Sequence, residues 1–194
     1  MAITINGTGS ITGLTAGGLP DGSITSADLA SGAITAGALP AGSILQMVMV
    51  ETSTPSAPTT ATTILTNTIT TKASSTDSDI YVIGNVCHGL GPRATNLDPY
   101  GLILRIRENG SNMSYYRADV FAGSGTGVTY GPEWDVRSLN ISAVSGATWS
   151  AGDSISYTIL AAPDGSDSYC LINRPNDGST SHGISYLLVM EVAK

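Results

Sequence analysis

The sequence is poor in charge, and above all in positive charge. Only 12% of its 194 residues are charged, and 8 Lys and Arg stand against 15 Asp and Glu, for a net charge of −7. The basic side chains are scattered along the chain, whereas a surface that binds nucleic acid needs them clustered to displace phosphate counterions. We therefore expect no nucleic-acid partner.

Long apolar runs and a secretory leader are also missing. No run approaches the ~18 apolar residues that a membrane-spanning helix needs. The first ten residues, MAITINGTGS, lack the basic start and apolar stretch of a signal peptide. We expect synthesis in the cytoplasm and no insertion into a membrane.

Cysteine and histidine are scarce, with two of each: Cys87, Cys170, His88 and His182. The cysteines are too few for a disulfide scaffold or a Cys-rich zinc site. They can pair with each other or stay free, and we favour two free thiols used as small apolar residues. Each histidine precedes a glycine with no second ligand nearby, so we predict loop histidines and no metal site.

No catalytic pattern stands out. The sequence has no G-x-S-x-G motif, and neither histidine has an evident orienting partner. The carboxylates of Asp119, Glu133 and Asp135 cannot be assigned to two sides of a cleft, as a glycosidase requires. The acidic segments 163–168 and 174–179 lack the length and bidentate glutamate of an EF-hand loop, and Asp-Gly turns explain them better. We predict no enzymatic activity and no cofactor.

The N-terminal part contains a repeat. Between residues 18 and 45 the unit L-x-x-G-[SA]-I-[TL] occurs three times at a spacing of ten residues. Ordering ten residues costs about 10–20 kcal/mol, whereas burying one Leu and one Ile returns about 3–6 kcal/mol. We therefore predict that identical chains run side by side as a shaft, with these side chains on a shared axis. The predicted axis residues are Leu19, Ile24, Leu29, Ile34, Leu39 and Ile44.

Each repeat is expected to combine a short extended step with a turn. Thr25 or Ser26 can cap a single helical turn, and Gly32 stands where a left-handed terminator is used. The competing interpretation is a disordered leader rich in Gly, Ser and Thr. The fixed offsets of Leu, Gly and Ile favour the repeat.

The composition changes near residue 44. Runs such as ILQMVMVE, DIYVIGNV, GLILRIRE, SISYTILA and GISYLLVMEV follow, separated by Gly, Pro, Asn and Asp. Short β-rich runs between turn residues, without helical periodicity, predict an all-β fold: an antiparallel β-sandwich or jelly-roll-like head. We assign residues 1–43 to the docking and shaft segment and residues 44–194 to the head.

Three features of the head concern packing. Ile80, Val82 and Val86 are predicted to share one face of a strand, and Trp149 to lie in the core or at a subunit interface. The C-terminal run SYLLVMEV is almost continuously apolar. This is typical of a central strand packed on both faces or of a strand at a subunit interface.

Segment 112–136 gathers five of the eleven aromatic residues. Aromatic faces beside hydrogen-bonding groups suit sugar or protein surfaces, and loops on a rigid sandwich often carry binding. The alternative is that some of these rings fill the core. The residues predicted to bind a receptor are Tyr115, Tyr116, Arg117, Tyr130 and Trp134.

Both parts of the chain resemble one group of proteins. The opening MAITINGTGSITGLTAGGLPDGSIT and the following ADLASGAIT resemble N-terminal segments of tail-fibre and other virion structural proteins of tailed bacteriophages, notably marine and cyanobacterial ones. GSILQMV, ASSTDSDIYV, LILRIRENG, SISYTILAAPDG and INRPNDGSTSHGISYLLVMEVAK resemble their globular heads. The resemblance implies a virion protein, made in the bacterial host cytoplasm and trimeric, with a jelly-roll-like head.

Two roles follow from that resemblance. In the first, the N-terminal segment docks on other virion proteins and the head attaches to a host-surface glycan or protein as a tail fibre. In the second, the protein is a capsid decoration, a head fibre or a tail connector that braces its neighbours. Three repeats make a short shaft, which favours the second role, whereas the aromatic segment favours the first. A secreted bacterial lectin is a third interpretation, although the sequence shows no signal peptide.

Overall fold

The structure is a computed structural model, and among the residues that it describes the regular structure is strand apart from one 3₁₀ turn, Ala36–Ala38. The residues it describes are 4–5, 11–12, 25, 27–28, 34–89, 100–120, 136–164, 170–173 and 183–194. The long strands are β3 (Ile44–Thr52), β4 (Thr62–Thr70), β5 (Ser78–Gly89), β6 (Tyr100–Glu108), β7 (Ser111–Val120), β8 (Val136–Val144), β9 (Ser154–Asp164) and β11 (Ser185–Ala193). The short strands are β1 (Thr4–Ile5), β2 (Ile11–Thr12) and β10 (Leu171–Ile172).

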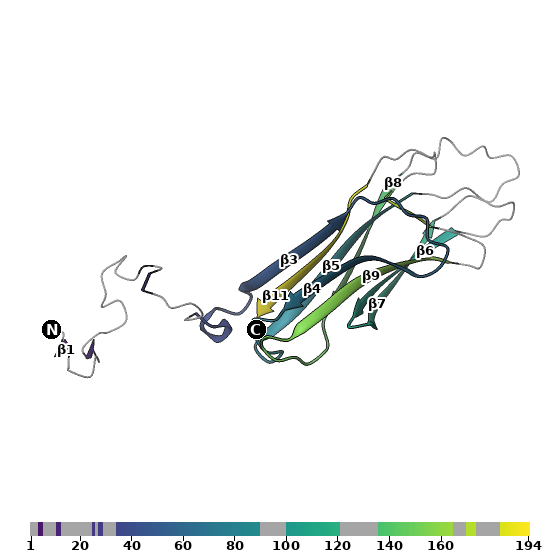
Figure 1. Cartoon of the computed structure of the whole chain (residues 1–194). Coiled ribbons are helices and arrows are strands. Elements are labelled where there is room, and N and C mark those ends of the chain that lie inside the picture. The colour runs from purple at the N-terminus through teal and green to yellow at the C-terminus, as the bar shows by residue number, and fades with distance from the viewer. Residues whose placement is uncertain are drawn as a thin grey trace, which may run out of the picture.

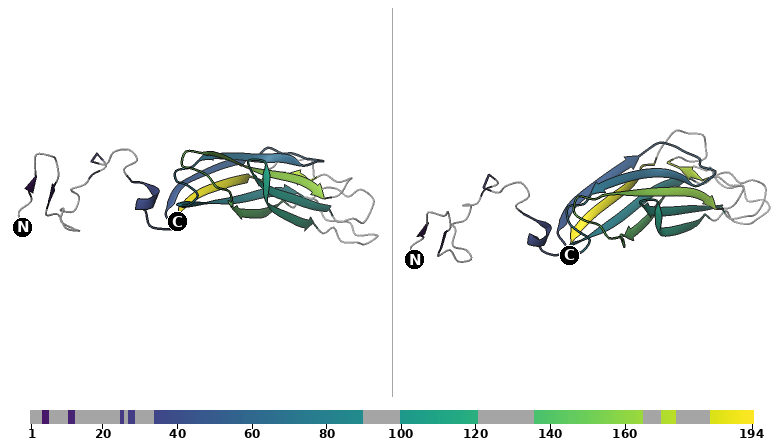
Figure 2. Two further views of the ribbon diagram at one scale, coloured as in Figure 1. Left: turned by 90° about the horizontal axis from the view of Figure 1, so that it is seen from below. Right: turned by 60° about the horizontal axis from the view of Figure 1, so that its bottom comes forward.

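The long strands form two antiparallel sheets that pack face to face (Figure 2). In the first sheet β8, β5, β11 and β3 lie side by side, and β10 pairs with the end of β5 beyond β11. The order of the second sheet is β4, β9, β6, β7. This architecture confirms the predicted all-β sandwich.

The pairing is nested along the chain. β6 pairs with β7, β5 with β8, β4 with β9 and β3 with β11, all antiparallel. The chain is thus one long folded ribbon, and it rolls up because β11 also pairs with β5 and β6 also pairs with β9. If the short β10 is left aside, each sheet has four strands, and this nested pairing of eight strands is that of a jelly roll.

The two ends of the sandwich differ. At the end where β3 begins and β11 ends, which we call the proximal end, the amide of Gly42 donates to Ala193 O (2.8 Å) and the amide of Ala193 donates to Ser43 O (2.8 Å). The C-terminus therefore lies beside the start of β3 (Figure 1). The strand connections at this end are 71–77, 109–110 and 145–153.

The core lies between the sheets and follows from the alternation of the strands. Ile80, Val82 and Val86 are fully buried on one face of β5, as predicted. Trp149 is buried in the core, and its indole N–H donates to Ala73 O at 3.1 Å. Gly84 has a packing role, because a Cβ built there lies 2.5 Å from Ile159 Cδ1. A glycine at this position allows the two sheets to approach each other.

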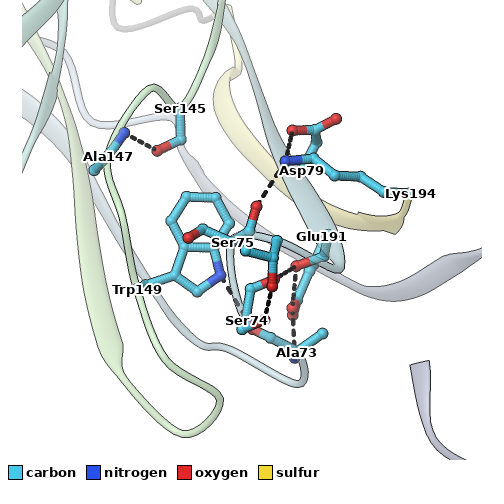
Figure 3. A network of polar contacts seen from close by, with 11 residues as sticks. Ala73, Ser74, Ser75, Asp79, Ser145, Ala147, Trp149, Glu191 and Lys194 are labelled. Carbon is cyan, nitrogen blue, oxygen red and sulfur yellow. Dashed lines mark hydrogen bonds and ion pairs between the residues drawn. The ribbon is translucent and has the colours of Figure 1, made fainter. Parts of the chain in front are cut away.

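A buried carboxylate closes the proximal end of the core (Figure 3). Glu191 of β11 is fully buried and accepts four hydrogen bonds. Its oxygens receive the amides of Lys72 and Ala73 (both 2.8 Å), the hydroxyl of Ser78 (3.0 Å) and the side-chain amide of Gln46 (2.5 Å). A buried carboxylate is tolerated when donors satisfy it in this way. Glu191 thereby joins β3, β11 and the turn between β4 and β5.

Only parts of the N-terminal segment lie within the described residues. Asp28 N donates to Thr25 O, and ten residues later Ala38 N donates to Thr35 O, both at 3.0 Å, so the same turn occurs at the same repeat position. The Asp28 carboxylate accepts hydrogen bonds from the hydroxyl and the amide of Thr25. Both lower the pKa of Asp28, and the hydroxyl has the larger effect.

The six predicted axis residues divide between the described and the remaining residues. Leu19, Ile24 and Leu29 lie outside the described residues, as does Gly32. Among the others, Ile34 and Ile44 are exposed in the single chain and Leu39 is half-buried. The shared axis stays a prediction.

We predict that Glu191→Gln lowers the free energy of unfolding by about 2–3 kcal/mol, because an amide N–H₂ group then faces backbone donors inside the core. The matched control is Glu51→Gln, an exposed carboxylate on β3, for which we expect a change within about 0.5 kcal/mol. Urea denaturation followed by circular dichroism measures both. Equal effects of the two substitutions would contradict the role assigned to Glu191.

Candidate functional site

The end of the sandwich opposite the proximal end, which we call the distal end, collects many strand ends. β3, β5, β7 and β9 end there, and β4, β6, β8, β10 and β11 begin there. The register shows this: Thr52 pairs with Ser185, Gly89 pairs with both Leu171 and Val136, and Tyr100 pairs with Val120. The segments attached to these strand ends are 53–61, 90–99, 121–135, 165–170 and 173–184. They are longer in total than the proximal connections, so most non-strand chain of the head is joined to the distal end.

The predicted receptor residues fall into two groups. Tyr115, Tyr116 and Arg117 belong to β7, where their backbones pair with β6. The start of segment 112–136 is therefore strand rather than loop. Tyr130 and Trp134 lie outside the described residues. β7 occupies an edge of the second sheet and runs toward the distal end, so segment 121–135 begins there.

A buried polar cluster supports the distal end. Asn173 is fully buried, with a left-handed backbone (φ 57°). Its side-chain amide donates to Thr52 O (3.0 Å) and Thr54 O (3.2 Å), and its side-chain oxygen accepts from the Ser185 hydroxyl at 2.6 Å. The same hydroxyl accepts from the amide of Cys87 at 3.0 Å, and Asn173 N donates to Cys87 O at 2.9 Å. The cluster ties β3, β5 and β11 to the chain after β10.

The sequence did not single out Asn173 as a structural centre. The available signal was an asparagine directly after the apolar run CLI, because Asn tolerates left-handed backbone better than most residues. Its partners come from three separate segments, and a single sequence does not show which segments meet.

The histidine prediction is partly wrong. His88 is not in a loop: it is a buried residue of β5, paired with Arg137 of β8 and Ile172 of β10. The expected strand-to-loop transition does lie here, but β5 continues through Gly89 because that glycine still pairs on both sides. His182 lies outside the described residues.

The cysteines are both free thiols, as favoured from the sequence. Cys170 is buried, and burial raises its pKa to about 12. A thiol with so high a pKa is protonated at neutral pH and unreactive as a nucleophile. Cys87 lies on β5, with its sulfur 3.5 Å from the hydroxyl of Ser138.

Tyr157, another buried titratable residue, also stabilises the fold. The Tyr157 hydroxyl donates to Glu108 Oε1 at 2.8 Å, and Ser145 donates to the same oxygen. Burial, reinforced by the hydrogen bond to Glu108, raises the pKa of Tyr157. The group lies at the proximal end, where β6 ends and β8 has just ended. It closes the core there.

The described parts of the chain offer no metal centre, since no group of three or more His, Cys, Asp or Glu residues in them is placed to hold an ion. Of the acidic segments, 174–179 lies outside these parts, and Pro163 and Asp164 of the other form the end of β9. Glu133 and Asp135 are also outside, and Asp119 is a residue of β7. No helix within the described residues is long and apolar enough to cross a bilayer.

Comparisons with known proteins add little. The chain matches no family model and no curated protein. Among solved structures it is similar to the C-terminal domain of EclA, a sugar-binding protein, with 10% sequence identity and a TM-score of 0.36 over 73% of this chain and 78% of that one. At this TM-score the similarity carries no argument about the function of this chain.

We predict that Asn173→Ala lowers the free energy of unfolding by about 2–3 kcal/mol, because it removes three buried hydrogen bonds and places an alanine in left-handed backbone. Asn173→Gly removes the same hydrogen bonds without the strain, so it should cost less, by about 1 kcal/mol.

The matched control for this pair is Asn109, an exposed left-handed asparagine (φ 47°) in the β6–β7 turn. Asn109→Ala tests the backbone strain without the buried contacts, and it removes one exposed hydrogen bond, which Asn109 Oδ1 accepts from Ser156 N (3.0 Å). Urea denaturation of the three variants separates the two contributions. If Asn173→Ala cost no more than Asn109→Ala, the buried cluster would not hold the distal end together.

Proposed function

We propose that this protein is a bacteriophage virion structural protein that docks through its N-terminal repeat segment and presents its β-sandwich head for attachment to the host surface. The observation that supports it most directly is the two-ended organisation of the head. The repeat segment joins the sandwich at the proximal end, through the hydrogen bonds of Gly42 and Ala193. The long strand connections, including the aromatic segment 121–135, are attached to the distal end.

This arrangement suits display. A rigid sandwich fixes the strand ends, and the buried Asn173 cluster holds the chain after β10 to β3, β5 and β11. Binding residues are commonly carried by connections on such a scaffold. The partner we propose is a host-surface glycan or protein, contacted by the aromatic residues of segment 112–136.

Weak contacts suffice if the heads are multivalent. A trimer presents three copies, and many fibres on one particle multiply the effect through effective concentration. The resemblance of the N-terminal repeat to phage virion proteins supports the same assignment, and it gives the virion as the location.

The second candidate is a capsid decoration, head-fibre or tail-connector protein that braces neighbouring subunits. The small number of repeats favours it, since the unit occurs three times in residues 18–45 and the third copy runs into β3. In this role the distal end needs no receptor, and the stability of the particle depends on the protein.

Immunogold electron microscopy of intact particles, with antibodies raised against residues 46–194, tests the location. We expect label at the tail, as attachment requires. Label spread over the capsid would replace attachment by the decoration role. No label on any particle of the phage that encodes the chain would contradict both virion assignments.

Trp134→Ala tests the proposed receptor contact. We expect host adsorption to fall at least tenfold while the melting temperature stays within about 2 °C, because a ring that contacts a receptor contributes little to folding. Trp149→Phe is the control: it removes the buried hydrogen bond to Ala73 O, so it should lower the melting temperature and leave adsorption unchanged below it. A large loss of stability in Trp134→Ala would assign that ring to the core instead.

A further inference from the structure

The proximal half of the outer face of the first sheet carries exposed apolar side chains. Met47 and Met49 of β3 are 60% and 57% exposed, Val144 of β8 is 52% exposed and Tyr81 of β5 is 38% exposed. Met190 and its neighbour Leu188 on β11, half-buried, lie between them. We call these six residues the apolar face.

The register makes this face continuous. Met47 pairs with Met190, Met190 with Tyr81 and Tyr81 with Val144, so one row of apolar residues crosses four adjacent strands. With neighbouring strands about 4.8 Å apart, the row spans roughly 15 Å. Beside it, Met49 pairs with Leu188 and forms part of a second row. Contiguous exposed apolar surface of this kind marks an interaction site more often than scattered single residues do.

The second sheet provides the contrast. The exposed residues of its edge strand β4 include Thr62, Thr66, Thr68 and Thr70. An antiparallel sheet with one solvated face is expected to be polar there. The β4 edge of the second sheet follows that expectation. The proximal half of the outer face of the first sheet does not, whereas Ser138, Asn140 and Ser142 of β8 make its distal part polar.

We propose that the apolar face packs against another copy of this chain. β3, which carries Met47 and Met49, begins at Ile44 directly after the repeat segment. If the repeats of several chains run side by side, β3 of every head begins at the same place, and the faces that β3 borders converge on the same axis. The choice of occupant thus rests on the assembly described under the proposed function.

The charges around the face are compatible with self-association. Asp79 and Lys194, at its proximal border, neutralise each other in an ion pair of 3.0 Å. Glu51 lies toward the distal end of β3, beyond the apolar rows. No charged residue stands among the six, so identical faces meet without like charges opposed. Methionine side chains also adapt easily to an apolar partner surface.

The test is oxidative footprinting of the purified full-length protein with hydrogen peroxide, read by peptide mass spectrometry and combined with light scattering. We expect a particle of three times 19.7 kDa, in which Met47 and Met49 oxidise at least tenfold more slowly than free methionine. In the single chain both are more than half exposed, so protection requires a cover.

Met49→Glu should open the interface, raising the oxidation rate of Met47 at least tenfold and lowering the mass at high dilution. Thr68→Glu is the matched control, since it adds the same charge at an exposed position on the second sheet and should change neither readout. Circular dichroism confirms that each variant is folded, and Met49→Thr, which keeps a good strand former, replaces Met49→Glu if that variant does not fold.

Three results would overturn the proposal. A 19.7 kDa monomer with rapidly oxidised methionines means that the face is free. An oligomer with rapidly oxidised methionines means that the chains associate elsewhere, as through the repeat alone. A monomer with protected methionines means that the chain's own segment covers the face. A monomer would also remove the trimer from the proposed function. Particle location and adsorption are measured separately, so attachment as such stands or falls by those measurements.

Discussion

The pairing of β3 with β11 is the constraint on which the sandwich depends. It joins the first and the last long strand of the head over the whole length from Ile44 to Thr52, so the first sheet is incomplete until the end of the chain has arrived. Contacts so distant in sequence cost loop-closure entropy before they return any stabilisation. Glu191, on the last strand, then closes the core by accepting hydrogen bonds from β3 and from the turn before β5.

The fold class was predictable, because buried and exposed residues alternate locally along each strand. The pairing of distant strands was not predictable. Ile80, Val82 and Val86 were correctly assigned to one face because a strand alternates with a period of two. The order of strands in the sheets depends on which distant segments pair, which no local pattern states. The same holds for Glu191. The sequence shows a glutamate within an apolar run, but its hydrogen-bond donors lie more than a hundred residues away in the chain.

The candidate site was less predictable than the fold. The aromatic segment 112–136 leads to the distal end, because β7 runs there from the proximal end, and its binding role stays a prediction. Tyr115, Tyr116 and Arg117 are nevertheless strand residues, because their backbones pair with β6. The apolar run of β11 was predicted to be a central strand packed on both faces or a strand at a subunit interface; β11 is central, between β3 and β5, and only one of its faces is fully buried. The outward face of β11, with Met190, is part of a larger apolar surface only because the register places Met47, Tyr81 and Val144 beside it.

The proximal attachment of the chain also has a mechanical consequence. A head held by its N-terminal segment and pulled at its distal end is loaded along β3, parallel to the strand. Its hydrogen bonds to β11 run across the strand and are therefore loaded in shear. All the rungs between Ile44 and Thr52 then resist the force together, whereas a strand peeled from its end loses them one at a time. The same ladder that closes the sandwich is oriented to resist tension applied between the proximal and the distal end.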